Sequence, residues 1–110
     1  MSASIEKLLK QAIKNQCDLI QLENESSGLE IYLISNNTGF PANLTKKELK
    51  DVLDFIFSLK KSKYFFLYLI DNVEYKIKIK WRSDFGEEVF SLKISTTTKN
   101  ENVGLTKLKN

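Results

Sequence analysis

The sequence predicts a single α+β domain whose helices cover one face of an antiparallel sheet. Residues 73–82 alternate strictly between apolar and charged side chains, which is the period of a half-buried strand. Two other segments repeat their apolar residues at helical spacing, and the remaining apolar runs are strand-sized. The predicted order is α-β-β-α-β-β-β over residues 1–95, followed by a polar tail or linker over residues 96–110.

The first helix is predicted from apolar residues spaced three or four positions apart. They are Ile5, Leu8, Leu9, Ala12 and Ile13. Ser2 or Ser4 can cap the start of this helix. Asn15-Gln16 is its expected end, because residues 17–22 have the pattern of a short, mostly apolar strand.

The next segment is predicted as a hairpin followed by a loop and a second helix. Residues 23–28 form the turn, residues 29–34 the second strand, and residues 36–43 the loop. Thr45 and Glu48 have the spacing of a capping box, in which each side chain bonds to the other's backbone N–H at a helix start. The apolar face of the helix comprises Leu49, Val52, Leu53, Ile56 and Leu59, widened by Phe55 and Phe57, and Lys60, Lys61 and Lys63 end it.

Three further strands are predicted after this helix. Residues 64–70 are apolar or aromatic throughout, which predicts a strand that is central in the sheet or covered on both faces. Asp71-Asn72 is a tight turn into the alternating strand, and residues 89–94 repeat the alternation. Between these two strands, residues 83–86 form the expected turn, where Gly86 can supply a positive φ.

Composition places the chain among folded domains. Of its 110 residues, 42% are hydrophobic, and no apolar run approaches the ~20 residues of a membrane helix. A single cysteine, Cys17, excludes an intramolecular disulfide and favours a reducing, cytoplasmic compartment. The lack of a long apolar run predicts no membrane insertion. Residues 1–55 carry 6 basic against 8 acidic side chains, and residues 56–110 carry 11 against 6. This asymmetry permits an acidic protein or nucleic acid as a partner.

Catalytic chemistry finds little support in the sequence. The chain has no histidine, which removes the commonest general base, and no GxxxxGK[ST] phosphate-binding loop. Cys17 is interpreted as a small buried hydrophobe, since no histidine can activate it. The cluster of Asp84, Glu87 and Glu88 is interpreted as acidic residues that solvate a turn. A carboxylate-based hydrolase at Asp84 and Glu87 is the least favoured hypothesis. We therefore predict no enzyme, no cofactor and no metal site.

The candidate binding residues lie on the polar face of the alternating strand and in its hairpin turn. They are Lys76, Lys78, Lys80, Arg82 and Phe85. A protein-docking face is the leading interpretation, and a phosphate-binding track for nucleic acid along residues 74–82 is the alternative. Sheets that bind nucleic acid use aromatic residues on the charged face, whereas Trp81 alternates with the charges and is expected on the opposite face. An exposed edge strand can also pair two copies, so a homodimer stays open.

The series of elements resembles the amino-terminal domain that precedes the motor of type II secretion and type IV pilus assembly ATPases. Asp18-Leu19 matches the family's small-residue-Asp-Leu-His-Ile strand, Gly28-Leu29 matches the start of its next strand, and Gly86-Glu87 followed by Val89 and Lys93 matches its closing hairpin. The resemblance covers roughly residues 5–105. It implies a PAS-like α/β fold, and a protein partner in a cytoplasmic secretion, pilus or conjugation machine.

Two departures from the family limit what the resemblance implies. Ile20-Gln21 replaces the family's His-Ile pair, and residues 31–36 replace its Arg-x-Arg-x-Asp-Gly strand, so the arginines that act near the nucleotide are missing. A direct role at ATP is therefore not expected. The sequence fits both a domain of a larger ATPase and a free-standing relative that has lost the motor.

Overall fold

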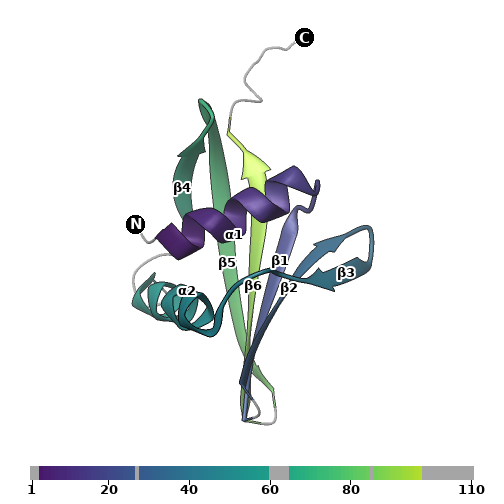
Figure 1. Cartoon of the computed structure of the whole chain (residues 1–110), viewed down its shortest axis with the longest axis vertical. Coiled ribbons are helices and arrows are strands. Elements are labelled where there is room, and N and C mark those ends of the chain that lie inside the picture. Colours follow the sequence, from purple (N-terminus) through teal and green to yellow (C-terminus); the bar gives the residue numbers. More distant parts are fainter. Residues whose placement is uncertain (1–2, 27, 60–64, 85, 98–110) are drawn as a thin grey trace.

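Six antiparallel strands form one sheet in the order β3-β2-β1-β6-β5-β4, with two helices packed on it. A computed structural model of the chain describes residues 3–26, 28–59, 65–84 and 86–97. Both helices lie over the same face of the sheet (Figure 1). The elements are α1 (Ala3–Lys14), β1 (Leu19–Glu25), β2 (Gly28–Ser35), β3 (Thr38–Pro41), α2 (Lys46–Leu59), β4 (Phe65–Ile70), β5 (Val73–Asp84) and β6 (Glu87–Thr96). The predicted α+β class is confirmed, whereas the predicted order α-β-β-α-β-β-β is wrong because it lacks β3.

The core lies between the helices and one face of the sheet. Alternate residues of the central strands point into it, including Ile20 and Leu22 of β1 and Phe90 and Leu92 of β6, all fully buried. The predicted stripe of α1 is buried at Ile5, Leu8, Leu9 and Ala12. The opposite face of the sheet, which we call the open face, carries the polar half of the alternation in β5.

The end of α1 follows from its backbone hydrogen bonds. Gln16 has a positive φ of 58°, the left-handed conformation that often ends a helix. The Cys17 N–H donates to the Ala12 carbonyl at 2.8 Å, and the Gln16 N–H donates to the Ile13 carbonyl at 3.1 Å. These two bonds form a Schellman motif, so the predicted end at Asn15-Gln16 is confirmed. Ser4 lies inside the helix and does not cap it.

The start of α2 is the predicted capping box. The Glu48 N–H donates to Thr45 Oγ1 at 3.2 Å, and the Thr45 N–H donates to Glu48 Oε1 at 2.8 Å. This backbone hydrogen bond, together with Lys7 nearby, holds the pKa of Glu48 below its usual range. The Lys7 ammonium lies 3.0 Å from Glu48 Oε2, which links the two helices.

Two aromatic pairs clamp α2 onto different strands of the sheet. Phe55 meets Phe66 of β4 edge to face at 5.4 Å between ring centroids, and Phe57 meets Phe90 of β6 at 5.3 Å. The interpretation that these two residues widen the packed face of the helix is therefore confirmed. It explains how one helix spans from the edge of the sheet to its centre.

Three predictions about the strands were wrong. The segment expected as a loop, residues 36–43, contains β3, because Asn36 and Asn37 both adopt positive φ and close a hairpin with β2. The expected turn at residues 23–28 is shorter, since β1 continues to Glu25, paired with Gly28. The strand expected to be central or covered, β4, is an edge strand that pairs with β5 alone among the described strands.

The hairpin of β5 and β6 is tighter than expected. Asp84 is paired with Glu87, so only two residues connect the strands, and Gly86 has the predicted positive φ, 82°. Thr97 closes the other end, because its hydroxyl donates to Glu74 Oε1 at 2.8 Å. The predicted features at Ser2, Lys60, Lys61, Lys63, Tyr64 and Phe85, and most of the predicted tail, lie outside the described residues. Within the described chain, neither helix has the length and apolar character to span a membrane.

Candidate protein-docking surface

The predicted basic residues lie together on the open face of the sheet. Lys78, Lys80 and Arg82 are exposed on β5, one strand in from the β4 edge. Lys76 is half-buried, and its ammonium lies 4.4 Å from the centre of the Phe65 ring, a cation–π contact with the neighbouring strand. Alternation along a long strand therefore places four cations in one row, as the sequence predicted.

A fifth cation, Lys93, joins this row from the neighbouring strand. The register of the hairpin places Lys93 of β6 directly opposite Lys78 of β5. Like charges at opposite positions of two strands repel each other and weaken the pairing. Lys93 was not among the predicted binding residues, although its alternation with Leu92 and Ile94 already indicated an outward position. We call Lys76, Lys78, Lys80, Arg82 and Lys93 the basic strip.

The basic strip is not neutralised within the described chain. The ion pairs between described residues are Lys7–Glu48, Lys10–Glu6 and Lys50–Asp54, and all of them belong to the helices. Among the side chains that the structure describes, no carboxylate pairs with Lys78, Lys80 or Lys93. The strip is therefore a concentration of positive charge directed at solvent.

An acidic patch occupies the part of the open face near the tips of the two long hairpins. It consists of Glu23, Glu25, Glu30 and Glu87. The negative charge of Glu87 is the main reason that the pKa of Glu25 is raised above its usual range. The tips lie side by side at the lower end of the molecule (Figure 1), and Asn24 Nδ2 donates to Glu88 Oε1 at 3.2 Å between them.

The two charged regions lie side by side across the strands. In one row, Arg82 of β5 is opposite Val89 of β6, which is opposite Glu23 of β1. Two strand spacings separate the cation from the first carboxylate, about 10 Å, which is close to the Debye length in physiological salt. The open face therefore has a positive side and a negative side, an arrangement that can orient a charged partner.

Three carboxylates of the acidic patch have the spacing of metal ligands. Oxygens of Glu23, Glu25 and Glu30 lie within 4.8 Å of one another. Neighbouring side chains already donate to two of them, Gln21 Nε2 to Glu23 at 2.7 Å and the Tyr32 hydroxyl to Glu30 at 2.9 Å. The cluster is partly solvent-exposed, and exposed acidic groups commonly gather without an ion. It therefore concentrates negative charge on this part of the open face.

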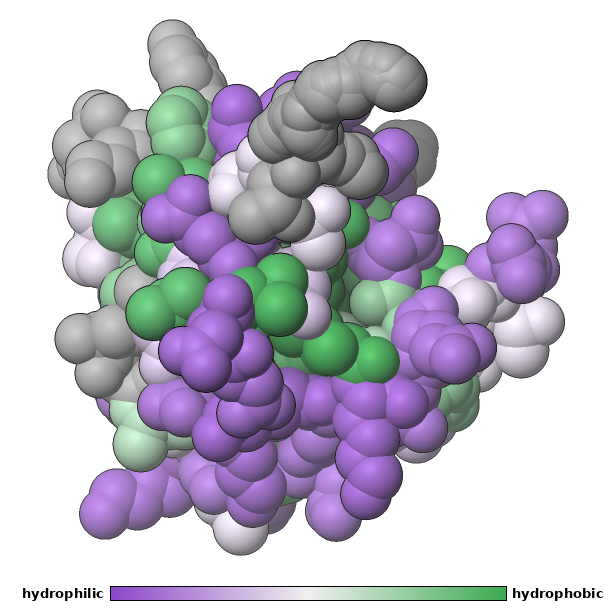
Figure 2. All heavy atoms as spheres, turned by 90° about the horizontal axis from the view of Figure 1, so that it is seen from above, coloured by the Kyte–Doolittle hydropathy of each residue, from purple (hydrophilic) through white to green (hydrophobic). Residues whose placement is uncertain are grey.

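Apolar side chains continue the open face onto the edge strand. Phe65, Leu67 and Leu69 of β4 are 40%, 48% and 64% exposed. Figure 2 shows the molecule from above, at the end that carries the β4–β5 turn, and hydrophobic patches lie there between hydrophilic ones. The alternating residues Phe66 and Ile70 are buried under the helices. One face of β4 is therefore apolar because it belongs to the core, whereas the apolar side chains of the other face are exposed. We call Phe65, Leu67 and Leu69 the apolar row.

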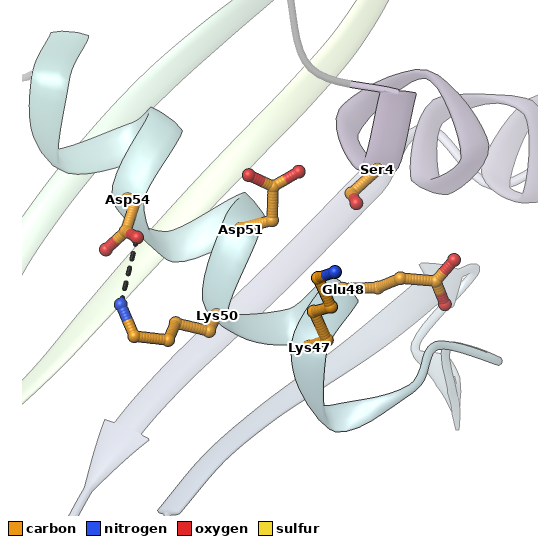
Figure 3. Close-up of a pocket in the computed structure, with 6 residues that line it drawn as sticks. All are labelled: Ser4, Lys47, Glu48, Lys50, Asp51 and Asp54. Atoms are coloured by element: carbon orange, nitrogen blue, oxygen red, sulfur yellow. Dashed lines mark hydrogen bonds and ion pairs between the residues drawn. The ribbon is translucent and has the colours of Figure 1, made fainter.

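The helix side of the molecule has a shallow hollow between α1 and α2. A cavity of about 390 Å³ is lined by Ser4 of α1 and by Lys47, Glu48, Lys50, Asp51 and Asp54 of α2 (Figure 3). Two of these carboxylates already have partners, since Lys50 lies 3.1 Å from Asp54, and Glu48 belongs to the capping box. These contacts serve the structure of α2.

The remaining candidate residues lie apart from the basic strip. Cys17 is buried and 3% exposed, as expected for a small hydrophobe, and burial raises the pKa of its thiol. Trp81 lies on the helix-side face of β5, 48% exposed, opposite to the charges, as its alternation predicted. Phe85, and the side chain of Asp84, lie outside what the structure describes.

No protein-family model matches the chain, and a search of curated proteins finds no significant match.

Proposed function

We propose that the protein is a non-catalytic interaction domain that docks an acidic protein surface on its basic strip. The observation that carries this proposal is the accumulation of five cations in adjacent positions of β5 and β6, none of them shown in an ion pair within the described residues. Lys78 and Lys93 are held opposite each other at a cost to strand pairing, and an acidic partner would relieve that repulsion.

The layout of the open face favours a protein over nucleic acid as the partner. A phosphate backbone carries uniform negative charge and would be repelled by the acidic patch beside the strip. A protein surface can match both signs, which fixes its orientation and speeds its encounter.

The cellular setting of this function rests on the family resemblance. We propose a PAS-like domain related to the amino-terminal domains of secretion and pilus ATPases, and a partner within such a cytoplasmic machine. The central position of β1 beside β6 and the placement of both helices on one face support this proposal. The absence of the family's arginines from β2 separates the docking role from nucleotide chemistry.

The test is a comparison of three forms of the full chain as baits in a native lysate, with and without nuclease treatment. The forms are the wild type, the Lys78→Glu/Lys80→Glu variant, and the Lys46→Glu/Lys47→Glu variant. The last changes the net charge by the same amount but places the new charges on α2, away from the open face. We expect one protein to be retained by the wild type and by the α2 variant, and to be lost with the strand variant.

Three kinds of outcome would contradict the proposal. Equal recovery of the same proteins by all three baits would show that the basic strip does not dock them. Binding that disappears after nuclease treatment, or direct binding of DNA or RNA that weakens steeply with salt for any sequence, would favour the nucleic-acid alternative. Carboxylate-dependent turnover would instead revive the hydrolase hypothesis at Asp84 and Glu87.

A further inference from the structure

The two edges of the sheet are protected to very different degrees. The edge strand β3 is only four residues long and contains Gly39 and Pro41, features that hinder pairing with another strand. The other edge, β4, has the sequence FFLYLI, with no charge, proline or glycine. Soluble proteins usually block an exposed edge with such residues, so an unblocked apolar edge indicates a site for strand pairing.

The backbone of β4 is oriented for such pairing. A two-residue hairpin loop is closed by a hydrogen-bonded pair, here Ile70 and Val73, and residues alternate in direction along an antiparallel ladder. The backbone groups of Phe65, Leu67 and Leu69 are therefore directed away from β5, at the edge that no strand of the described chain covers. These are also the residues of the apolar row, whose side chains lie exposed on the open face. One added strand would pair with these backbone groups and would also contact the side chains of the apolar row.

We propose that β4 pairs with β4 of a second copy of this chain, antiparallel and centred on Leu67, to form a symmetric dimer with one continuous sheet. In this register Leu67 meets Leu67 of the second copy, and Phe65 meets Leu69 at both ends. The apolar row is thus complementary to itself about a twofold axis, which is the requirement for a closed dimer. Every outward-directed backbone group of these three residues finds a partner.

The charges beside β4 agree with the antiparallel direction. Lys78 is paired with Phe65, and Glu74 is paired with Leu69. Antiparallel pairing therefore brings the Lys78 end of one copy to the Glu74 end of the other, whereas parallel pairing would bring like charges together. The residues are about 14 Å apart, three strand spacings, so the charges set orientation more than affinity.

The helix side of β4 is already occupied, which confines the free surface to its edge and the open face. Phe66 packs against Phe55 of α2, and the Tyr68 hydroxyl donates to Glu6 of α1. These contacts hold β4 in place in the monomer, so pairing requires no rearrangement of the described fold. The dimer is independent of the basic strip, because Lys78, Lys80 and Lys93 stay exposed on strands further from the edge.

The first experiment measures the mass of the full chain in solution at increasing concentration. We expect the wild type to approach twice the chain mass, and the Leu67→Lys variant to stay monomeric with an unchanged circular dichroism spectrum. A matched control, Thr38→Lys, places the same side chain on the other edge strand and should dimerise as the wild type does. A monomeric wild type at all concentrations, open-ended aggregates, or a dimer that survives Leu67→Lys would overturn the proposal.

The second experiment tests the register. In the proposed dimer the two Leu67 Cα atoms are about 5.5 Å apart, within the range of roughly 4.4–6.8 Å that a disulfide spans. The two Leu69 Cα atoms are about 14 Å apart, because they are offset by four residues along the strands and by one strand spacing across them. We expect Leu67→Cys to give a disulfide-linked dimer on mild oxidation and Leu69→Cys to give none, while Cys17 stays buried. Crosslinking of Leu69→Cys alone would refute this register.

Discussion

The Tyr68 hydroxyl donates a 2.8 Å hydrogen bond to Glu6 Oε1, joining the edge strand β4 to the first turns of α1 across 62 positions of sequence. This bond is the largest contribution to the lowered pKa of Glu6, ahead of its contact with Lys10. Partial burial and the same carboxylate raise the pKa of Tyr68. The relationship matters because it fixes the strand on which the proposed dimer depends.

Replacing Tyr68 by Phe should lower the melting temperature at neutral pH by removing this bond. The effect should depend on pH, because a lowered carboxyl pKa contributes stability above its unfolded value, near 4.3, and loses it as the pH falls through the folded value. The difference between wild type and variant should therefore narrow in acid. Thermal melts from pH 7 to pH 3 check this, and a difference that is constant over the whole range would contradict it.

The end of α1 offers a stabilising substitution. Gln16 holds a left-handed conformation that costs a residue with a side chain about 1–2 kcal/mol and costs glycine little. Gln16→Gly should therefore raise the free energy of unfolding by about 0.5–1 kcal/mol, the larger entropy of glycine in the unfolded chain offsetting part of the gain. Lys14→Gly, inside the helix, should lower stability instead. Chemical denaturation distinguishes the two signs.

Glu25→Gln should stabilise the protein at neutral pH. Repulsion from Glu87 raises the pKa of Glu25 in the folded protein. Glu25 therefore starts to destabilise the fold when the pH exceeds its pKa in the unfolded chain, and the full loss of stability is reached above its pKa in the folded protein. The gain in stability from Glu25→Gln should thus appear as the pH rises between these two pKa values, and it should vanish at lower pH.

Glu48→Gln is the matched control for this charge effect. The pKa of Glu48 is lowered by the Thr45 backbone hydrogen bond and by Lys7, so its contribution is favourable above the unfolded value and is lost in acid. This variant should be less stable than the wild type at pH 7. Melting curves of Glu25→Gln and Glu48→Gln across pH test both expectations. Melting temperatures that change in the same direction and by the same amount in both variants would contradict the opposite roles of the two carboxylates.

Lys93→Glu should separate stability from binding. The substitution removes the repulsion with Lys78 and creates an opposite-charge pair, worth roughly 0.2–1 kcal/mol. If the basic strip is the docking surface, partner retention should fall although the fold becomes more stable. Lys47→Glu, an equal charge change on α2, should leave retention intact. A Lys93→Glu variant that binds as the wild type does would exclude Lys93 from the docking surface.

The sequence by itself determined the features that depend on local periodicity and capping. The alternation of residues 73–82 fixed which side chains of β5 face solvent, because successive residues of a strand point to opposite faces. The capping box at Thr45 and Glu48 fixed the start of α2 through contacts three residues apart. The α+β class followed from these segments.

Only the tertiary structure decided which elements are neighbours. The apolar sequence of β4 fits a buried strand and an exposed edge equally well, and sheet order placed it at the edge. A turn over residues 83–86 would set Ser91 opposite Lys78, whereas the two-residue loop sets Lys93 there. Pairing between distant strands depends on loop length and global packing, and one shift in register changes every cross-strand contact. The four cations of β5 were therefore predictable from the sequence. The addition of Lys93 to the basic strip, the acidic patch and the exposure of the apolar row could be identified only from the pairing of strands in the fold.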